Sequence, residues 1–285
     1  HTILDSRNYA VAEDIVYDGD NPRNGDEQAA LTSFGFAEGD VEFLSRADGF
    51  KNLSEVTAAP ADFTLSDEIK STFYNTYNWN PDDFNDPSDI MPKTGATNGI
   101  KLAEMRGIDF DDEKWELLLD ELTISDMDKL IALGGYGTLS INHIGKSATN
   151  DNDGPANIVN NFTGGASIGF PSEVIIASTW NQKLVERFGE SIGTMADELD
   201  VSGWYAPGMD SHRSAFDGRN FEYYSEDGVL AGRIGAAAVR GVQNKGLYAY
   251  MKHFVLNDQQ AAQAEMLCTW VSEQALREVF LKPFE

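Results

Sequence analysis

Short apolar runs alternate with longer amphipathic segments in the second half of the chain, and this alternation limits the possible folds more than any other feature. The apolar runs, each bounded by polar or Gly-rich turns, are Val174 to Ala177, Gly203 to Ala206 and Leu247 to Val255. The segments that follow them predict helices at 182–199, 227–243 and 259–280. Since strands that alternate with helices form a parallel sheet, we predict an α/β fold.

Two parallel architectures are then possible, an open nucleotide-binding sheet and a (β/α)8 TIM-type barrel. A nucleotide-binding sheet needs a Gly-rich phosphate loop directly after a strand, whereas Gly134-Gly135-Tyr136-Gly137 follows a predicted helix. The barrel is therefore favoured. Functional side chains of barrels lie at the C-terminal ends of the strands, where we expect Met209 to Asn220 and Lys252 to Asp258.

Helix signals are clear in three places outside the strands. Acidic residues from Asp111 to Glu113 precede apolar residues at helical spacing, which is typical of a helix N-terminus. Ser125 with Asp128 resembles a capping box for a second helix, which Gly134 and Gly135 end. The segment from Gln182 to Leu199 is the clearest amphipathic helix of the chain.

Residues 1–110 differ from the rest of the chain in composition. They are rich in Asp, Asn, Gly, Pro and Ser and show no sustained periodicity, so we predict an irregular extended arm or interdomain linker before a domain at 111–285. Apolar and aromatic side chains in this arm predict anchors against the surface of another domain: Phe34, Phe36, Val41, Phe43, Leu44, Phe50, Phe73, Tyr74 and Tyr77.

Charge and composition exclude several classes of function. The formal net charge is -26, which repels phosphate backbones and anionic lipid surfaces, so nucleic acid is not an expected partner. No window of the sequence is apolar enough for a membrane span, and no targeting signal is visible, so the compartment stays open. The single cysteine, Cys268, is predicted to pack on a helix. Neither His143 nor His212 has ligands at a recognised spacing, and we expect no metal and no cofactor.

Charged and titratable side chains gather between Gly218 and Asn257, close to predicted strand ends. Arg219 offers a rigid fork of donors, Lys252 a point charge with three donors, and His253 one donor and one acceptor. This set suits a ligand covered in hydroxyl groups and predicts a carbohydrate site. The alternative for each residue taken alone is a buried salt-bridge cluster.

Several motifs in this region occur in an order that resembles the barrel domain of family 3 glycoside hydrolases. They cover about residues 111–285 and comprise Asp153-Gly154-Pro155, Gly169 to Ser172, Thr179 to Asn181, Trp204 to Pro207, Arg213-Ser214, Gly218 to Asp227, Lys252 to Phe254, Leu276 to Glu278 and Lys282 to Glu285. Members of this family are mostly retaining beta-glucosidases and related exo-acting enzymes, with a pocket for the terminal sugar at the barrel mouth.

The resemblance implies a role for six residues of this chain. Asp153 would accept hydrogen bonds from hydroxyls of the non-reducing sugar, and Arg219, Lys252 and His253 would donate to its other hydroxyls. The supporting residues are Arg213 and Glu222. Alternatives remain for each: Asp153 as a turn residue, Arg219 with Glu222 as a structural ion pair, and His253 as a core histidine. Glu226 and Asp227 are expected to begin a helix instead of acting as catalysts.

The resemblance also implies that no catalytic residue lies in this segment. Retaining hydrolysis needs two carboxyl groups, and the family's nucleophile follows the Lys-Pro-Phe-Glu motif, at which this chain stops. We therefore expect an incomplete barrel, whose partners are the remaining domains of the same enzyme or an associated chain, and whose substrate is a beta-glucoside or cello-oligosaccharide. Some bacterial members that resemble this sequence carry their sandwich domain ahead of the barrel domain.

Two departures from the family pattern affect the finer interpretation. Gln260 and Gln263 stand where many relatives have Glu and Arg, so a supporting ion pair is lost, and the loop from Met209 to His212 differs from the usual Asn-containing form. The competing hypothesis is a non-catalytic sugar-binding fragment or scaffold. A phosphorylase or an N-acetylglucosaminidase of the same family is weaker, because the anion site or the distinctive His-containing loop that each needs is not found.

Overall fold

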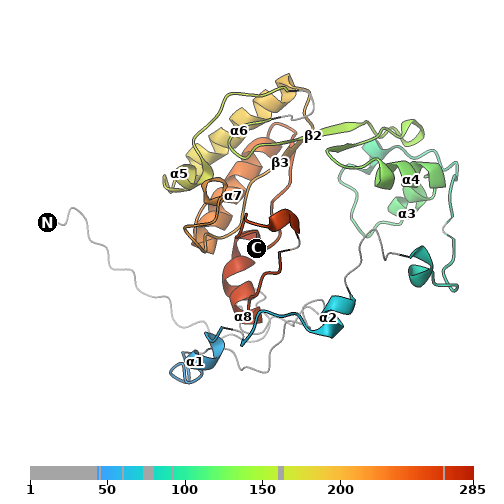
Figure 1. Cartoon of the computed structure of the whole chain (residues 1–285). Coiled ribbons are helices and arrows are strands. Elements are labelled where there is room, and N and C mark those ends of the chain that lie inside the picture. Colours follow the sequence, from blue (N-terminus) through green and yellow to red (C-terminus); the bar gives the residue numbers. More distant parts are fainter. Residues whose placement is uncertain are drawn as a thin grey trace.

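Two long helices supply much of the larger hydrophobic core of the molecule. The structure is a computed structural model and describes residues 44, 46–59, 61–72, 80–91, 93–159, 164–265 and 267–285. Helix α6 spans Gln182–Glu198 and helix α7 spans Gly228–Gln243, within one residue of the predicted bounds, and the two pack side by side (Figure 1). As expected, Asp227 begins α7, because its carboxylate accepts hydrogen bonds from the first-turn amides of that helix.

The contact between α6 and α7 depends on glycine. A Cβ at Gly189 would collide with the main-chain oxygen of Ala238, and one at Gly241 with that of Glu186. The two backbones therefore approach each other more closely than side chains would allow. Around them lies a large cluster of buried apolar residues, which includes Val185, Ile192, Trp204, Ile234 and Val242.

A small sheet lies against these helices, in the order β1-β2-β3-β4. Strands β2 (Thr149–Asp153), β3 (Gly203–Tyr205) and β4 (Tyr248–Ala249) are parallel, whereas β1 (Gly137–Thr138) pairs antiparallel with β2. Helices separate β2 from β3 and β3 from β4, so the chain builds two successive βαβ units. The parallel sheet and its crossover helices confirm the α/β prediction and form part of a barrel.

A second, smaller core lies apart from the helix pair (Figure 1). It is built from the 3-10 helices η3 (Leu102–Met105) and η4 (Asn142–Ile144) with α3 (Lys114–Leu119) and α4 (Ile124–Ala132). The buried apolar residues are Ile100, Met105, Leu118, Ile141 and Ile144.

The helix α4 is predicted correctly, but its capping box is not the one expected from Ser125 and Asp128. Thr123 is the N-cap, and it exchanges hydrogen bonds with Asp126 in a complete capping box. The helix thus begins two residues earlier than the Ser125 pattern indicates, because Ile124 occupies the first helical position.

Three further predictions are wrong. Val174 to Ala177 is not a strand but lies in the short helix α5 (Glu173–Ala177), which begins after Ser172. A four-residue apolar run fits either state, and packing decides between them. The predicted helix at 259–280 is broken into η6 (Gln263–Glu265), α8 (Glu273–Ala275) and the π-helix η7 (Leu276–Phe280), before η8 (Lys282–Phe284). Cys268 lies outside these helices and is exposed.

The described parts of the arm contain only short helices: α1 (Leu53–Val56), α2 (Asp67–Ser71) and η2 (Pro81–Phe84). Of the predicted anchors, Leu44 exchanges two main-chain hydrogen bonds with the side-chain amide of Gln274, at 2.7 and 3.0 Å, and Phe50 is exposed. Phe63, which was not predicted as an anchor, packs edge to face on Trp270. The other predicted anchors lie outside the described residues.

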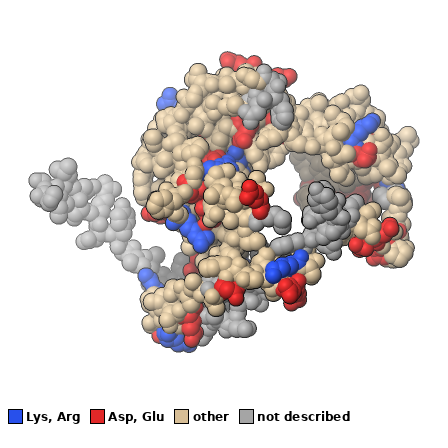
Figure 2. All heavy atoms as spheres, in the orientation of Figure 1, with Lys and Arg blue, Asp and Glu red and all other residues tan. Residues whose placement is uncertain are grey.

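Acidic and basic side chains lie next to each other at several places on the face shown in Figure 2, despite the large negative net charge. Every helix in the described ranges is too short or too polar to cross a membrane. The same ranges contain no group of three or more His, Cys, Asp or Glu side chains placed to hold a metal ion.

Candidate functional site

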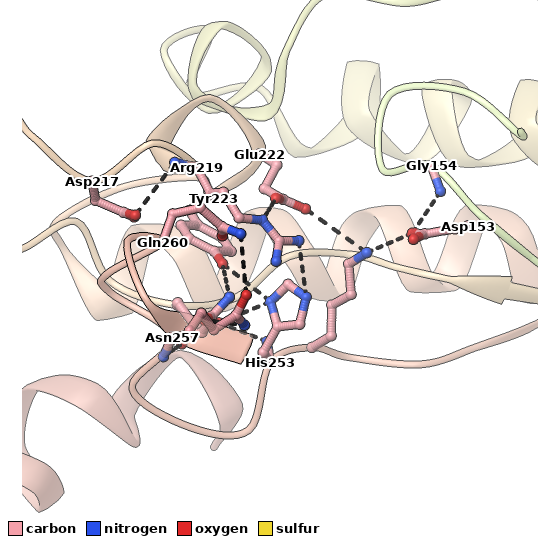
Figure 3. Close-up of polar contacts among 12 residues, drawn as sticks. Asp153, Gly154, Asp217, Arg219, Glu222, Tyr223, His253, Asn257 and Gln260 are labelled. Carbon is pink, nitrogen blue, oxygen red and sulfur yellow. Dashed lines mark hydrogen bonds and ion pairs between the residues drawn. The ribbon is translucent and has the colours of Figure 1, made fainter. Parts of the chain in front are cut away.

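Polar side chains from three strand ends converge at one edge of the sheet (Figure 3). Asp153 is the last residue of β2, Arg219 and Glu222 belong to the loop between β3 and α7, and Lys252 and His253 follow β4. Isolated parallel bridges from Gly208 to Tyr223 and to Lys252 prolong the sheet at this edge. Because the strands are parallel, their C-terminal ends lie together. The active sites of barrel enzymes lie at this end of the strands.

Lys252 is at the centre of the cluster and is only 3% exposed. Its Nζ lies 2.6 Å from Asp153 Oδ1 and 3.8 Å from Glu222 Oε2, and it lies 4.6 Å from the centre of the Tyr205 ring. Two carboxylates and an aromatic face thus hold this buried amine in position.

Arg219 is held from two directions. Its Nε donates to Glu222 Oε1, and its Nη2 lies 3.0 Å from His253 Nε2. Burial opposes the charge of the guanidinium, but the hydrogen bond and the negative charge of Glu222 outweigh it and raise the pKa of Arg219. The ion pair that the sequence analysis kept as an alternative for Arg219 and Glu222 is therefore present, inside the cluster.

Both ring nitrogens of His253 have a partner in this arrangement. Besides the contact of Nε2 with Arg219, Nδ1 lies 3.1 Å from the hydroxyl oxygen of Tyr223. The main chain around His253 is fixed by Asp210, whose two carboxylate oxygens accept from the amides of His253, at 2.6 Å, and Asn257, at 2.8 Å.

Asp210 and Tyr223 were missed as site residues by the sequence analysis. Asp210 lies in the loop that was expected at a strand end, but nothing in its neighbours marks it as an acceptor for a turn more than forty residues later. Tyr223 follows Glu222 directly, but a tyrosine is also a common core residue, so its identity alone does not mark it as part of a site. In the structure its ring is fully buried.

The structure does not bring Arg213 into the cluster. Its guanidinium pairs with Asp258 at 2.8 Å and lies over the ring of Phe280, while 45% of its side chain is exposed. Gln260 and Gln263, which replace the expected ion pair, form a chain of hydrogen bonds instead: Gln260 Nε2 donates to Gln263 Oε1 at 3.1 Å, and Gln263 Nε2 donates to Asn257 Oδ1 at 2.9 Å.

A further acidic side chain, Glu173, lies behind the cluster in the first turn of α5. It is 1% exposed, and neither of its carboxyl oxygens has a hydrogen-bond partner on another described residue. Burial raises the pKa of Glu173 to about 8, and the negative charge of Glu222 adds to this effect. The carboxyl group of Glu173 is therefore mostly protonated at neutral pH.

The cluster combines two cations and two carboxylates with an imidazole, all with donors or acceptors at a strand-end edge. Both carboxylates, Asp153 and Glu222, are paired with Lys252 or Arg219. Such paired groups present fixed donors and acceptors to a polyhydroxylated ligand.

The parallel sheet, the crossover helices and the polar strand ends define a TIM-barrel domain of the kind found in glycoside hydrolases. Residues 152–285 match the model of the Glycosyl hydrolase family 3 N terminal domain. The resemblance stated from the motifs, and the barrel fold that it implies, are both confirmed.

Relatives with beta-glucosidase names each match somewhat more than half of the chain. "Beta-glucosidase A" of Butyrivibrio fibrisolvens is 39% identical over 152 residues, which are 53% of this chain and 18% of the relative. "Beta-glucosidase" of Rhizobium radiobacter is 34% identical over 176 residues, 59% of this chain and 21% of the relative. The chain thus spans about a fifth of the length of these curated relatives.

Two solved beta-glucosidase structures are similar to part of this chain. Beta-glucosidase 3B from Thermotoga neapolitana, solved in complex with alpha-D-glucose, is 36% identical and superposes with a TM-score of 0.54, covering 60% of this chain and 27% of that one. A beta-glucosidase from Paenibacillus barengoltzii gives a TM-score of 0.58 at 29% identity and covers 69% of this chain and 22% of that one.

Proposed function

We propose that this chain is part of a retaining, exo-acting beta-glycosidase and that it supplies residues that bind the terminal sugar. Among beta-glycosidases, a beta-glucosidase is the activity that we favour. The substrate is a beta-glucoside or cello-oligosaccharide, from which the enzyme releases the terminal non-reducing glucosyl residue through a covalent glycosyl-enzyme intermediate. One observation supports this most strongly: Asp153, Arg219, Lys252 and His253 converge from separate strand ends into one buried polar cluster.

The binding roles follow from the chemistry of the cluster. Asp153 accepts hydrogen bonds from sugar hydroxyls, while Lys252 and Arg219 donate to others with the protons that their carboxylate partners leave free. Glu222 supports both cations from within the site, and Arg213 supports the surrounding loop through Asp258. A sugar that lacks a matching hydroxyl leaves a buried charged group without a partner, which is costly and gives specificity.

The two catalytic carboxyl groups are assigned to segments other than these 285 residues. In a retaining glycosidase they lie roughly 5 to 5.5 Å apart, and one of them must be free to attack the anomeric carbon. Both carboxylates of the described cluster hold cations instead. We accordingly propose that the arm at 1–110 joins the barrel domain at 111–285 to a further domain. The barrel itself would be closed by the remaining segments of the same enzyme or by an associated chain.

Turnover by the full-length protein tests this proposal. With p-nitrophenyl beta-D-glucoside, Lys252→Ala and Arg219→Ala should each lower kcat/KM by about 100-fold, since a lost hydrogen bond to a charged group costs about 1.5 to 3 kcal/mol and each 1.4 kcal/mol is tenfold. Proton NMR of the first-formed glucose should show the beta anomer, as retention requires.

Matched controls separate binding from folding. Lys183→Ala and Arg187→Ala remove the same charges from exposed positions of α6 and should leave turnover unchanged. Wild-type turnover in both site variants would remove those residues from the site. Glucose binding without any turnover in a protein whose intact mass equals the 31.3 kDa of this sequence would favour the sugar-binding fragment instead.

A further inference from the structure

A buried carboxylate lies one step below the polar cluster, on the same face of the sheet. Asp151 is 5% exposed and lies two residues before Asp153 on β2, so both side chains point to one face. The hydroxyl of Tyr248 donates to Asp151 Oδ1, and the hydroxyl of Tyr250 donates to Oδ2 at 2.7 Å. Each oxygen of this carboxylate therefore has a tyrosine partner, and the two tyrosines lie on β4 or directly after it.

Strands β2 and β4 are not neighbours, because β3 lies between them. Strands two apart in a sheet lie roughly 9.5 Å from each other, and side chains of the middle strand normally fill the space above it. Here the middle residue is Gly203, which pairs with both Asp151 and Tyr248 in the register of the sheet. A Cβ at Gly203 would collide with the Tyr248 ring and with the Asp151 carboxylate. The missing side chain thus lets β2 and β4 contact each other directly.

The main-chain ladder alone does not keep Lys252 in register with the neighbouring strand. The amides of Tyr250 and Lys252 donate to the main-chain oxygens of Trp204 and Pro207, both at 2.9 Å. A step of two residues on one side therefore faces a step of three on the other, which is the pattern of a β-bulge. Because the bulge interrupts regular pairing just before Lys252, contacts between side chains are needed to fix this residue.

Aromatic rings connect the buried carboxylate to the amine of Lys252. The Tyr250 ring packs edge to face on Tyr248 and on Tyr205, with ring centres 5.5 and 5.8 Å apart. Lys252 Nζ lies 4.6 Å from the centre of the Tyr205 ring and 2.6 Å from Asp153 Oδ1. The chain of contacts thus ends at the ion pair that joins the same two strands one step further along.

We propose that Asp151 and its two tyrosines form a clamp across β3, which positions Lys252 and Asp153 for the sugar. The clamp holds β2 and β4 at the spacing at which the amine and the carboxylate of the ion pair meet, on the near side of the bulge. Its three members are positioning residues, since they act through the polar cluster and do not belong to it. The effect on the sugar rests on the proposed function, whereas the clamp between the strands does not.

Turnover of deoxygenated substrates by the full-length protein separates positioning from folding. The kcat/KM for p-nitrophenyl beta-D-glucoside is compared with that for each of its monodeoxy analogues. Tyr250→Phe should lower the preference for the glucoside over the least tolerated analogue about fivefold, the effect of one hydrogen bond. A variant that only folds less well loses turnover with every substrate and keeps its preferences.

Tyr224→Phe is the matched control for the loss of a tyrosine hydroxyl. Its ring is buried, and its oxygen has no hydrogen-bond partner among the described residues, so the variant should keep the wild-type preference. Asp151→Ala removes both hydrogen bonds of the clamp and should lower the preference at least about tenfold. Asp151→Asn should restore most of it, because an amide can accept from one hydroxyl and donate to the other.

Urea unfolding tests the clamp without any substrate. Asp151→Ala and Tyr250→Phe remove the two ends of one hydrogen bond, so their losses of stability should not add in the double variant. Additive losses would overturn the clamp, and a wild-type substrate preference in Tyr250→Phe would overturn its positioning role. The Tyr250 ring is 39% exposed, so this variant decides the second point even where Asp151→Ala fails to fold. A wild-type protein that hydrolyses no beta-glucoside would count against the proposed function, and the unfolding measurements would still decide the clamp.

Discussion

The two hydrophobic cores of this molecule are stabilised in different ways. The larger core surrounds the α6–α7 pair and consists of closely packed apolar side chains and glycines, with few polar groups. The smaller core around α3 and α4 has only five buried apolar residues and relies on specific hydrogen bonds, such as that from the Ile100 amide to the buried carboxylate of Glu121 at 2.6 Å. We infer that added volume disrupts the first core, whereas lost polar contacts disrupt the second.

The largest effect is expected for Gly241→Ala in the larger core. The new methyl group would meet main-chain atoms of Glu186 and Glu190, which cannot move aside as a side chain can. Separation of α6 from α7 should cost about 3 kcal/mol or more, visible as a lower midpoint of urea unfolding. Ala236→Val adds more atoms to the exposed face of α7 and should cost no more than about 0.7 kcal/mol. Equal effects of the two changes would contradict close backbone packing.

Glu173 makes the stability of the larger core depend on pH. Its pKa is about 8 in the folded protein against an ordinary value of 4.5. The unfolded chain therefore loses this proton first as pH rises, and the contribution of Glu173 to stability, complete below pH 4.5, declines between 4.5 and about 8 by a few kcal/mol.

The variant Glu173→Gln removes this titration. Between pH 5 and pH 8, urea unfolding should show a smaller loss of stability in the variant than in wild type. The charged or titratable groups that act on the Glu173 side chain are Glu222, Lys252 and Tyr224. An identical pH dependence in both proteins would show that Glu173 ionises normally in the fold.

The same contrast explains which parts of the structure could be predicted from the sequence. Helices α6 and α7 and strand β3 were placed within a residue or so, because their apolar periodicity matches the packing that stabilises them. The polar cluster was anticipated because parallel strand ends must meet. The structure of the segment after residue 256 was not predicted correctly, because its short helical turns depend on contacts with residues far away in the chain. One such contact joins Leu44 and Gln274.

The site itself was predictable only to the level of its charged residues. Arg219, Lys252 and His253 are recognisable from their chemistry, and Asp153 from the resemblance to family 3. The groups that orient them, Asp210 and Tyr223, act across 43 and 30 positions of sequence, and no local pattern signals such pairs. Three-dimensional contact is the only source of that information.

A smaller effect is expected for Glu121→Ala in the second core. Its carboxylate accepts from the Ile100 amide, and a lost hydrogen bond to a charged group costs about 1.5 to 3 kcal/mol. Hydrogen exchange of the Ile100 amide should become about ten- to a hundredfold faster. Glu116→Ala, an exposed position of α3, should leave that amide protected. Unchanged protection in Glu121→Ala would show that apolar packing alone holds this core.

The smallest effect distinguishes two possible starts of α4. Thr123→Ala should destabilise the second core by about 1 kcal/mol, because it removes the side-chain acceptor for the Asp126 amide at 3.1 Å. Ser125→Ala should be neutral or slightly stabilising, since position 125 lies inside the helix, where Ala is the better helix former. Hydrogen exchange of the first-turn amides of α4 measures both changes under the same conditions. Greater loss of protection in Ser125→Ala than in Thr123→Ala would restore the capping box that the sequence alone suggested. A greater loss of protection in Thr123→Ala would show that the capping hydrogen bond of Thr123, two residues before Ser125, helps to hold the smaller core together. A core that buries little apolar surface is sensitive to the loss of such a hydrogen bond.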